Sequence, residues 1–224
     1  MRVVVRIGGS VVASPVNTEL MSKYTKMVQT LKEQGHEVAV VVGGGSLARE
    51  FITIAKKLGL GEPAQDEIAI SVSRLFAQLF LKTLSEMACK KVALTLDDAA
   101  ECLSKGTTIV MGGLKPGITT DAVAALVAER INADLLVKCT DQDGVYNKDP
   151  RKYADAVKLD HLSFDDLANV FSENKHKAGI HQIIDPEAVK ILKSGRMKLI
   201  VVNGFKPENI FAAVKGESVG TMVK

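Results

Sequence analysis

The chain has 224 residues, of which 46% are hydrophobic and 25% are charged, proportions that are ordinary for a globular domain and exclude an intrinsically disordered chain. Its 29 basic and 26 acidic residues give a net charge of +3, which is too balanced for a protein whose main partner is nucleic acid. Small molecules are therefore the expected ligands. The length fits one large domain with a sizeable core.

Export and membrane insertion are not indicated. The opening residues 1–12 read as a short strand pattern, and their apolar stretch is too short for a signal peptide. No run approaches the roughly 20 apolar residues that a membrane-spanning helix needs. The cysteines Cys89, Cys102 and Cys139 are odd in number and widely spaced, so they predict neither a disulfide framework nor a metal site. We expect a cytoplasmic protein in a reducing compartment, with Cys139 as a small core residue.

Short runs rich in Val and Ile alternate with longer amphipathic segments along the chain. The runs expected to form strands are residues 3–7, 38–42, 91–95, 108–111, 134–139 and 198–202. The segments expected to form helices are residues 17–34, 46–58, 66–87, 97–103, 119–132, 163–170, 186–193 and 207–214. Strands that alternate with helices at this spacing predict a parallel sheet with helices on both faces. No internal repeat or linker divides the chain, so we expect one domain.

Three of the expected strands end in glycine-rich turns. These turns are residues 8–10, 43–46 and 112–113, the last leading to 116–120. Glycine lets a backbone approach a ligand closely, and the free N–H groups at a following helix start suit phosphate. Ligands of open α/β sheets bind at the carboxyl ends of the strands. The three turns together therefore predict a site for several phosphates, although each alone could be an ordinary turn.

Neither common nucleotide fingerprint is present. The chain has no G-x-x-x-x-G-K-[ST] motif, and no G-x-G-x-x-G motif follows the first strand. A P-loop enzyme and a dinucleotide-dependent enzyme are both disfavoured.

Four motifs occur in the order and spacing of one known superfamily. They are Arg6-Ile7-Gly8-Gly9-Ser10, Val42-Gly43-Gly44-Gly45-Ser46-Leu47-Ala48-Arg49, Pro116-Gly117-Ile118-Thr119-Thr120-Asp121-Ala122 and Thr140-Asp141-Gln142-Asp143-Gly144-Val145-Tyr146. With them the chain resembles the amino acid kinase superfamily, and within it the archaeal-type UMP kinases. The resemblance covers essentially the whole length. It implies a three-layer αβα sandwich around a mainly parallel sheet of about eight strands.

The same resemblance implies an activity and its partners. The γ-phosphoryl group of ATP would pass to UMP, giving UDP and ADP in pyrimidine nucleotide synthesis. The N-terminal part of a single domain, residues 1–224, would bind the acceptor and the C-terminal part would bind ATP. Mg²⁺ would be held through the ATP phosphates, with no metal ligand from the protein, and the chains would assemble as a homo-hexamer.

Site residues are also implied by the resemblance. The residues expected to act in catalysis are Arg6, Gly9, Ser10 and Asp141. The residues expected to bind ATP are Gly9, Ser10, Gly45, Arg49, Thr140, Asp141, Tyr146 and Asp149. The residues expected to bind UMP are Gly44, Asp66, Leu114, Lys115, Pro116, Gly117, Ile118, Thr119 and Thr120.

Several of these residues also have a plainer structural explanation. Asp66 at a helix start can accept from ribose hydroxyls, or it can simply complement the helix dipole. Thr119 and Thr120 offer hydroxyl and backbone N–H groups to a phosphate, and they also suit an N-cap. Arg49 contacts a phosphate or is an ordinary surface arginine, and Asp149 also suits a turn before a proline.

Arg6 and Asp141 depart from the pattern of the relatives. Many superfamily members carry Lys at the first position, and UMP kinases more often carry Asn or Lys at the second. We expect Arg6 and Asp141 to face each other across neighbouring strand ends, with Asp141 orienting Arg6 toward the transferred phosphoryl group. The alternative is that Arg6 points to solvent. Leu114 and Ile118 are less polar than expected for a loop that contacts UMP.

Two other functions stay open. Another kinase of the superfamily, acting on carbamate, acetylglutamate or isopentenyl phosphate, shares most of these motifs. A non-catalytic nucleotide-binding protein could also be built on the same fold, since binding residues alone do not prove turnover.

Overall fold

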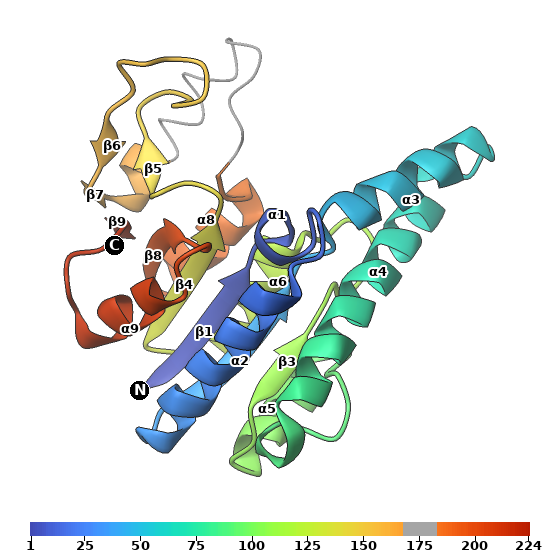
Figure 1. Cartoon of the computed structure of the whole chain (residues 1–224), viewed down its shortest axis with the longest axis horizontal. Coiled ribbons are helices and arrows are strands. Elements are labelled where there is room, and N and C mark those ends of the chain that lie inside the picture. The colour runs from blue at the N-terminus through green and yellow to red at the C-terminus, as the bar shows by residue number, and fades with distance from the viewer. Residues whose placement is uncertain (168–182) are drawn as a thin grey trace.

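A central sheet organises residues 1–167 and 183–224, which are the residues that the computed structural model describes (Figure 1). Five parallel strands lie side by side: β3 (Ile109–Met111), β2 (Glu37–Val42), β1 (Arg2–Ile7), β4 (Leu135–Thr140) and β8 (Lys198–Asn203). They read as mainly apolar runs because both of their faces are buried, with Arg6 in β1 and Lys138 in β4 as charged exceptions. The prediction of a mainly parallel sheet is confirmed.

Shorter strands complete the sheet on one side. The antiparallel strand β9 (Thr221–Val223) pairs with β8, and β7 (His161–Leu162) pairs with β9 at the outer edge. This gives a seven-stranded sheet in the part of the chain that the structure describes, against the expected number of about eight. A separate antiparallel pair is formed by β5 (Val145–Tyr146) and β6 (Lys158–Leu159). The sequence did not predict these four short strands.

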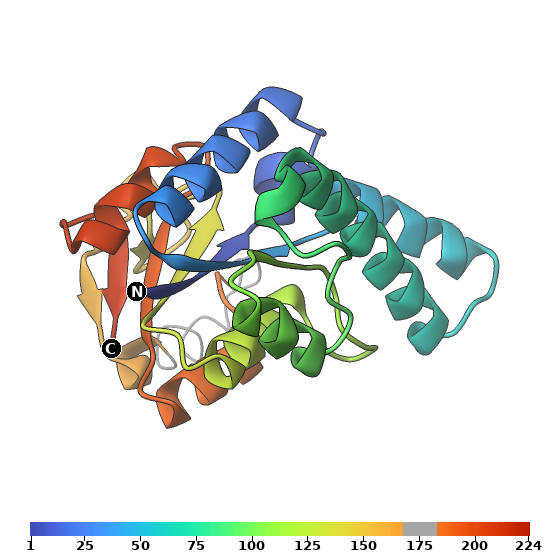
Figure 2. The same cartoon turned by 90° about the horizontal axis from the view of Figure 1, so that it is seen from below.

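Helices cover both faces of the sheet (Figure 2). One layer contains α1 (Gly9–Val12), α2 (Thr18–Glu33), α4 (Glu62–Thr83) and α9 (Glu208–Lys215). The opposite layer contains α5 (Leu96–Ser104), α6 (Thr120–Arg130) and α8 (Pro186–Ser194). Alternate residues of β1 enter the two cores, with Val3 and Val5 on one side and Val4 on the other. The expected αβα sandwich is confirmed.

The helix pair α3 (Gly45–Lys57) and α4 extends away from the sheet as an arm (Figure 1). The sequence places the start of the second helix at Asp66, but α4 begins at Glu62 with Pro63 in its first turn. It ends at Thr83, and the 3-10 turn η1 (Ser85–Met87) follows. Even α4, with 22 residues, lacks the apolar length for a bilayer, and no other helix among the described residues has it.

Two further expectations need comment. Residues 91–95 do not form a strand, since only Ala93 makes an isolated bridge, to Met111. The Asp98 carboxylate accepts hydrogen bonds from the backbone N–H groups of Leu94 and Thr95 at the capping box of α5. These groups are therefore not free to form hydrogen bonds with a neighbouring strand. In the helix expected at 163–170, residues 164–167 are helical and the rest lies outside the described residues.

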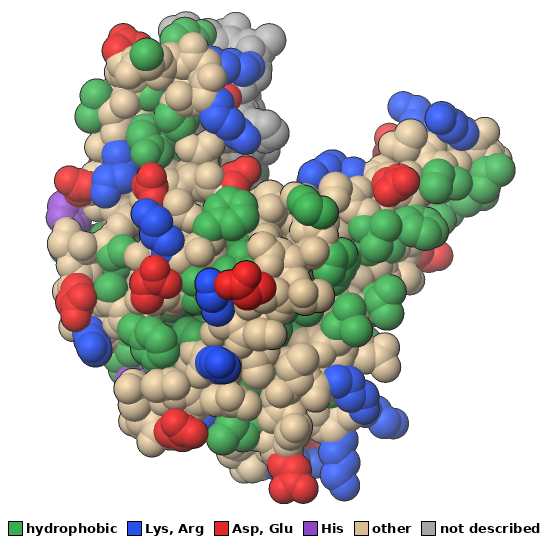
Figure 3. Space-filling view, viewed as in Figure 1, with side chains coloured by type: hydrophobic (Ala, Val, Ile, Leu, Met, Phe, Trp, Pro, Cys, Tyr) green, Lys and Arg blue, Asp and Glu red, His purple; other side chains and the backbone are tan. Residues whose placement is uncertain are grey.

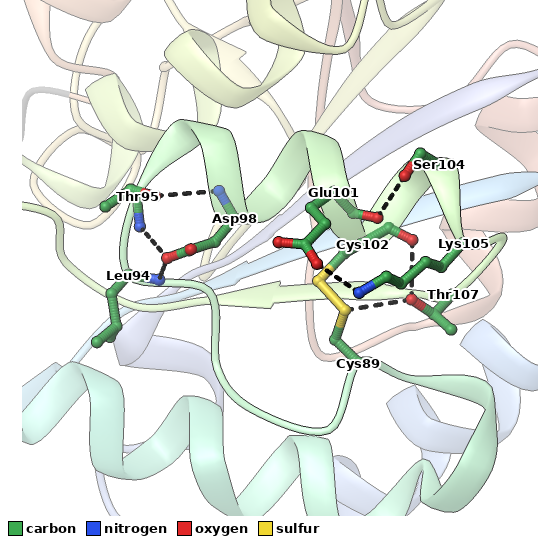
Figure 4. Close-up of a disulfide and its surroundings, with 9 residues drawn as sticks. All are labelled: Cys89, Leu94, Thr95, Asp98, Glu101, Cys102, Ser104, Lys105 and Thr107. Atoms are coloured by element: carbon green, nitrogen blue, oxygen red, sulfur yellow. Dashed lines mark hydrogen bonds and ion pairs between the residues drawn. A yellow bond between two sulfur atoms is a disulfide. The ribbon is translucent and has the colours of Figure 1, made fainter.

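Cys89 and Cys102 form a disulfide, which corrects the expectation of unpaired cysteines (Figure 4). Cys89 lies just after η1, and Cys102 lies on α5. The disulfide therefore joins the segment after η1 to α5, which packs against β3. The close approach depends on the tertiary fold, which spacing alone does not reveal. With this pair present, cysteine usage no longer indicates a reducing compartment. Cys139 is free and buried, as expected.

Candidate active site

The carboxyl ends of β1, β2 and β4 meet at one edge of the sheet and open into a pocket of about 750 Å³. Figure 3 shows a broad hollow between the α3–α4 arm and the part of the molecule that carries β5 and β6. The pocket is lined by residues from six segments: Arg6, Gly8, Gly9 and Ser10; Gly43, Gly44, Gly45 and Arg49; Thr120 and Asp121; Lys138 to Gln142; Tyr146 and Lys148 to Arg151; and Ile183. This is the edge at which ligands of open α/β sheets bind.

The first two glycine turns are in direct contact with each other. A Cβ atom on Gly9 would lie only 2.5 Å from the Cα atom of Gly45. Gly45 has a φ of 62°, and a Cβ atom there would lie 2.5 Å from the carbonyl oxygen of Ala13. Only glycine fits both positions. The two turns therefore form one continuous backbone surface at the pocket, with α3 starting from it.

Three charged side chains meet beneath these turns. Arg6 on β1 and Lys138 on β4 both form ion pairs with Asp121 in the first turn of α6. The Arg6 Nε atom lies 2.6 Å from Asp121 Oδ1. The three side chains are 13%, 7% and 12% exposed respectively, so two buried cations share one carboxylate. The cluster carries a net positive charge that faces the pocket.

The pKa values of this cluster reflect both burial and charge. Burial acts to raise the pKa of Asp121, but the charges of Arg6 and Lys138 outweigh it and hold the pKa at about 2. Burial lowers the pKa of Lys138 to about 8, against the opposing attraction of Asp121. Asp121 is thus ionised at neutral pH, while Lys138 is charged and close to its titration range.

Arg6 keeps hydrogen-bonding capacity despite its ion pair. Its Nη2 donates to the Thr120 hydroxyl at 2.7 Å. Within the described chain neither Arg6 Nε nor Asp121 Oδ1 makes a hydrogen bond of good geometry, although both are buried. These two atoms face each other as an ion pair at 2.6 Å, so their charges are compensated within the cluster although the geometry is not that of a hydrogen bond.

The expected pairing of Arg6 with Asp141 is wrong. Arg6 pairs with Asp121, whereas Asp141 pairs with Arg151 at 3.5 Å and accepts from the Thr140 hydroxyl at 3.3 Å. Asp141 lies just beyond the end of β4, at the rim of the pocket. Lys138, three residues earlier in the chain, is buried within the strand. The alternative that Arg6 points to solvent is also wrong.

A loop at the pocket rim carries Tyr146 and Asp149, two of the residues expected to bind ATP. Asp149 is buried, and burial acts to raise its pKa, but hydrogen bonds from the Arg151 backbone N–H and guanidinium keep it below the ordinary value. Tyr146 lines the pocket beside it. The Thr221 hydroxyl on β9 accepts from the Val145 backbone N–H at 2.8 Å, which fastens β5 to the edge of the main sheet.

All the residues expected to bind ATP line this pocket. They are Gly9, Ser10, Gly45, Arg49, Thr140, Asp141, Tyr146 and Asp149. They come from three separate parts of the sequence and are brought together by the order of β1, β2 and β4.

The residues expected to bind UMP are divided. Gly44 and Thr120 line the pocket, whereas Asp66 and residues 114–119 lie outside its lining. Asp66 nevertheless joins this segment, since its carboxylate accepts from the Gly117 backbone N–H at 2.8 Å. Leu114 and Ile118 pack against the core, which explains their apolar character. Their side chains anchor the segment to the core, and α4 binds its backbone at Leu114 and Gly117.

The third glycine turn has a different role from the first two. Gly112 and Gly113 are not part of the described pocket lining, and their backbone packs on α4 instead. The segment continues to Thr119, which accepts from the Ala122 N–H as the N-cap of α6 and donates to Asp185. Thr120 is the residue of this turn that reaches the pocket.

Asp121 and Lys138 were not assigned a role from the sequence. Asp121 follows the threonine pair within a recognised motif, but its side chain had no expected partner. Lys138 interrupts the apolar run 135–139, and a charged residue inside a doubly buried strand is rare unless it is paired. That interruption was the available signal. Cys139, by contrast, has its thiol pKa raised to about 12 by burial, so it remains a neutral thiol.

The donor set around the pocket suits a phosphate-bound magnesium ion. Among the described residues no group of three or more His, Cys, Asp or Glu side chains could hold a metal on its own. Asp121 and Asp149 are engaged by cations or backbone N–H groups, and Asp141 lies at the rim. Mg²⁺ usually keeps several waters and binds through substrate phosphates, which fits the expectation that the ATP phosphates would hold it.

Comparison with known proteins gives matches over the whole chain. A model of the amino acid kinase family matches residues 1–203. Uridylate kinases of Methanocaldococcus jannaschii and Archaeoglobus fulgidus are 42% and 43% identical to the chain, and each alignment covers 100% of both sequences. The crystal structure of the Archaeoglobus fulgidus uridylate kinase matches with a TM-score of 0.91 at 42% identity, covering 100% of both chains. A UMP kinase structure from Bacillus anthracis, 19% identical, shares the fold with a TM-score of 0.82.

Proposed function

The chain belongs to the amino acid kinase family, and on that premise we propose that it is a UMP kinase. It transfers the γ-phosphoryl group of ATP to a phosphate oxygen of UMP, giving UDP and ADP, as a step in pyrimidine nucleotide synthesis. The observation that carries the proposal is the pair of buried cations, Arg6 and Lys138, that share Asp121 beneath two fused glycine turns.

The chemistry of the acceptor makes a general base unnecessary. A UMP phosphate oxygen is already ionised at neutral pH, so catalysis depends on alignment of the two nucleotides and on neutralising charge on the transferred group. Arg6 and Lys138 supply fixed positive charge at this point. Asp121 holds both cations in place and itself stays ionised. Preorganised charge of this kind needs no reorganisation during the reaction.

Backbone groups and rim residues bind the two nucleotides. The N–H groups of Gly9, Ser10 and Gly45 would contact the ATP phosphates together with Arg49, and Thr140, Asp141, Tyr146 and Asp149 would contact its nucleoside end. Gly44, Asp66 and the segment 114–120 would hold UMP. In this scheme the N-terminal part of a single domain binds the acceptor and the C-terminal part binds ATP. Mg²⁺ bound to the ATP phosphates adds charge neutralisation when present.

Self-association as a hexamer is part of the proposal. Large hydrophobic side chains are exposed along the arm, at Phe51 and Ile54 on α3, at Leu58 just after it, and at Leu75 and Leu79 on α4. Figure 3 shows hydrophobic side chains along the arm in green. An extended apolar surface of this kind typically marks a protein interface. Analytical ultracentrifugation should give a hexamer. A stable monomer would refute this part, and so would a dimer that does not assemble further.

A cytoplasmic location is also proposed, because ATP and UMP are the substrates. It is tested by fractionating cells of the source organism and locating the chain by immunoblot; recovery with the envelope would contradict it.

Release of ADP is the direct test of the acceptor. The protein is incubated with ATP and Mg²⁺ and, in parallel, with UMP, CMP, carbamate, N-acetylglutamate or isopentenyl phosphate. UMP-dependent release is expected. Release with another acceptor alone would replace the proposal with a different kinase of the family, and release with none would leave a nucleotide-binding protein.

Arg6→Ala separates transfer from binding. It removes a buried positive charge that faces the transferred group, so kcat should fall far more than the affinity for UMP. Isothermal titration with UMP and steady-state kinetics measure the two quantities. An unchanged kcat would remove Arg6 from the mechanism.

A further inference from the structure

One side of α4 lies directly against the third glycine turn and the segment after it. Asp66, Ile70, Ser73 and Arg74 are spaced so that they share one face of the helix. All four contact residues 112–117 through a hydrogen bond or close packing. The helix therefore acts as a continuous support for this segment.

Arg74 makes the most specific of these contacts. Its Nε donates to the Gly113 carbonyl oxygen at 2.9 Å, and its Nη2 donates to the Leu114 carbonyl oxygen at 2.8 Å. Ser73 accepts from the Gly113 backbone N–H at 2.7 Å and donates to the Ile70 carbonyl oxygen at 2.7 Å. The Arg74 guanidinium thus fixes two successive carbonyl groups, while Ser73 fixes the backbone N–H of Gly113, which precedes them.

The glycines explain how the turn comes so close. A Cβ atom on Gly112 would lie 2.7 Å from the Arg74 backbone nitrogen, and one on Gly113 would lie 2.9 Å from Ile70 Cγ1. Real Cβ atoms essentially never approach another heavy atom to this distance. The absence of side chains at 112 and 113 therefore serves contact with α4, and the turn has no room to shift toward the helix.

We propose that Arg74 is a positioning residue for the acceptor, an inference that rests on the proposed function. Arg74 itself does not line the pocket. It fixes the backbone at Gly113 and Leu114, which leads to Thr119 and Thr120, and the Thr120 hydroxyl accepts from Arg6 at 2.7 Å. Through this segment Arg74 determines where UMP is held relative to the transferred phosphoryl group.

An arginine is required for this geometry. The guanidinium group is planar and presents parallel N–H donors, so it can bind two neighbouring carbonyl groups at once, whereas a lysine offers a single point of attachment. Arg74→Lys should therefore keep part of the function, and Arg74→Met should lose it. Lys82→Met is the matched control, because it removes a cation from an exposed position of the same helix.

The kinetic test compares the two substrates. For Arg74→Met, the KM for UMP should rise at least about tenfold, equivalent to about 1.4 kcal/mol, with Arg74→Lys intermediate. The KM for ATP should stay within about twofold of the wild type, because Arg74 binds Gly113 and Leu114, which lie outside the pocket lining that contains the residues expected to bind ATP. Lys82→Met should match the wild type. An unchanged KM for UMP, or equal changes for both substrates, would overturn the proposal.

Hydrogen exchange tests the anchoring without any substrate. Amides in the peptide that covers residues 112–118 should exchange faster in ligand-free Arg74→Met, while peptides from β1 and β4 keep wild-type rates. Unchanged exchange at 112–118 would overturn the anchoring role even if kinetics changed. The exchange experiment contains no UMP, so its result tests the anchoring role independently of the proposed function. The proposed function would instead be refuted if the wild-type protein showed no UMP-dependent release of ADP.

Discussion

The pocket contains two groups of charged side chains that are held in different ways. Arg6, Asp121 and Lys138 extend from strands of the sheet and from the first turn of α6, and they are nearly inaccessible to solvent. Arg151 and Asp141, by contrast, lie in the segment that follows β4 and are 48% and 32% exposed. Both groups contain ion pairs, but the inner pairs are desolvated and the rim pair is hydrated.

The difference determines what each group can contribute. A charge removed from water interacts strongly with any neighbouring charge, because screening is weak. An exposed ion pair contributes little and is easily exchanged for water. We therefore expect the inner cluster to control the rate of transfer and the stability of the site. The rim should adjust nucleotide affinity, and the following changes test this contrast.

Lys138→Met should have the largest effect. It removes a buried positive charge beside the transferred group but keeps the length of the side chain, so kcat should fall by about 10³. Lys148→Met, which removes a more exposed cation from the same pocket, is the control and should lower kcat less than about fivefold. Steady-state kinetics with saturating ATP and UMP measure both. Equal losses would show that depth in the pocket does not matter.

Asp121→Asn should weaken the fold itself. It removes the carboxylate that pairs with both Arg6 and Lys138, and breaking a buried ion pair typically costs about 3 kcal/mol or more. Urea denaturation followed by circular dichroism measures the free energy of unfolding. Asp141→Asn at the rim should change it by less than about 0.5 kcal/mol. If the two variants were equally stable, the inner cluster would not be the structural element we infer.

The activity should fall as pH rises past the pKa of Lys138. That pKa is about 8 in the free protein, so Nζ is positive below this pH and becomes neutral above it. The value of kcat/KM for ATP should then decrease about tenfold per pH unit on the alkaline side. Bound phosphates favour the charged form, so kcat should persist to higher pH.

Lys138→Arg provides the control for this profile. A guanidinium group stays charged throughout the range, so any activity that the variant retains should lack the alkaline decrease. If kcat/KM of the wild type stayed constant up to about pH 9.5, the charge of Lys138 would not control the rate.

Arg151→Met should have the smallest effect. It breaks the exposed contact with Asp141 and the guanidinium contact with the buried Asp149, which keeps the Arg151 backbone N–H. The KM for ATP should rise about threefold with kcat nearly unchanged. Added salt should reduce the difference between wild type and variant, because exposed pairs are screened. A loss of kcat comparable to that of Lys138→Met would place Arg151 in the inner group.

The sequence predicted the main helices and strands better than it predicted which charged side chains pair with each other. Apolar runs such as 38–42 and the amphipathic segment 17–34 carry their own periodicity, so β2 and α2 lie where they were expected. Residues 221–223 form a strand only because β8 is already in place beside them, and the short segment has no such signal of its own. Residues 91–95 have a strand-like composition, but a local cap competed successfully for their N–H groups.

The candidate site was predicted in part. Glycine turns mark the pocket because their backbone geometry depends on the residue type itself. The partner of Arg6 could not be predicted from the sequence, because Asp121 and Asp141 both lie within recognised motifs. Only the packing of α6 against β1 and β4 places Asp121 beside Arg6. The same holds for Arg74 and for the pairing of Cys89 with Cys102, which depend on contacts between separate elements.

The hydroxyl of Thr221 has a consequence for the order in which the pocket becomes complete. It binds Val145, 76 residues earlier in the chain, and it also donates to the Leu159 carbonyl oxygen. A ribosome produces the segment with Tyr146 well before it reaches residue 221, and domains form from the N-terminus during synthesis. The nascent protein can therefore assemble its glycine turns early, but the part of the pocket lining that contains Tyr146 is secured only when β9 has docked.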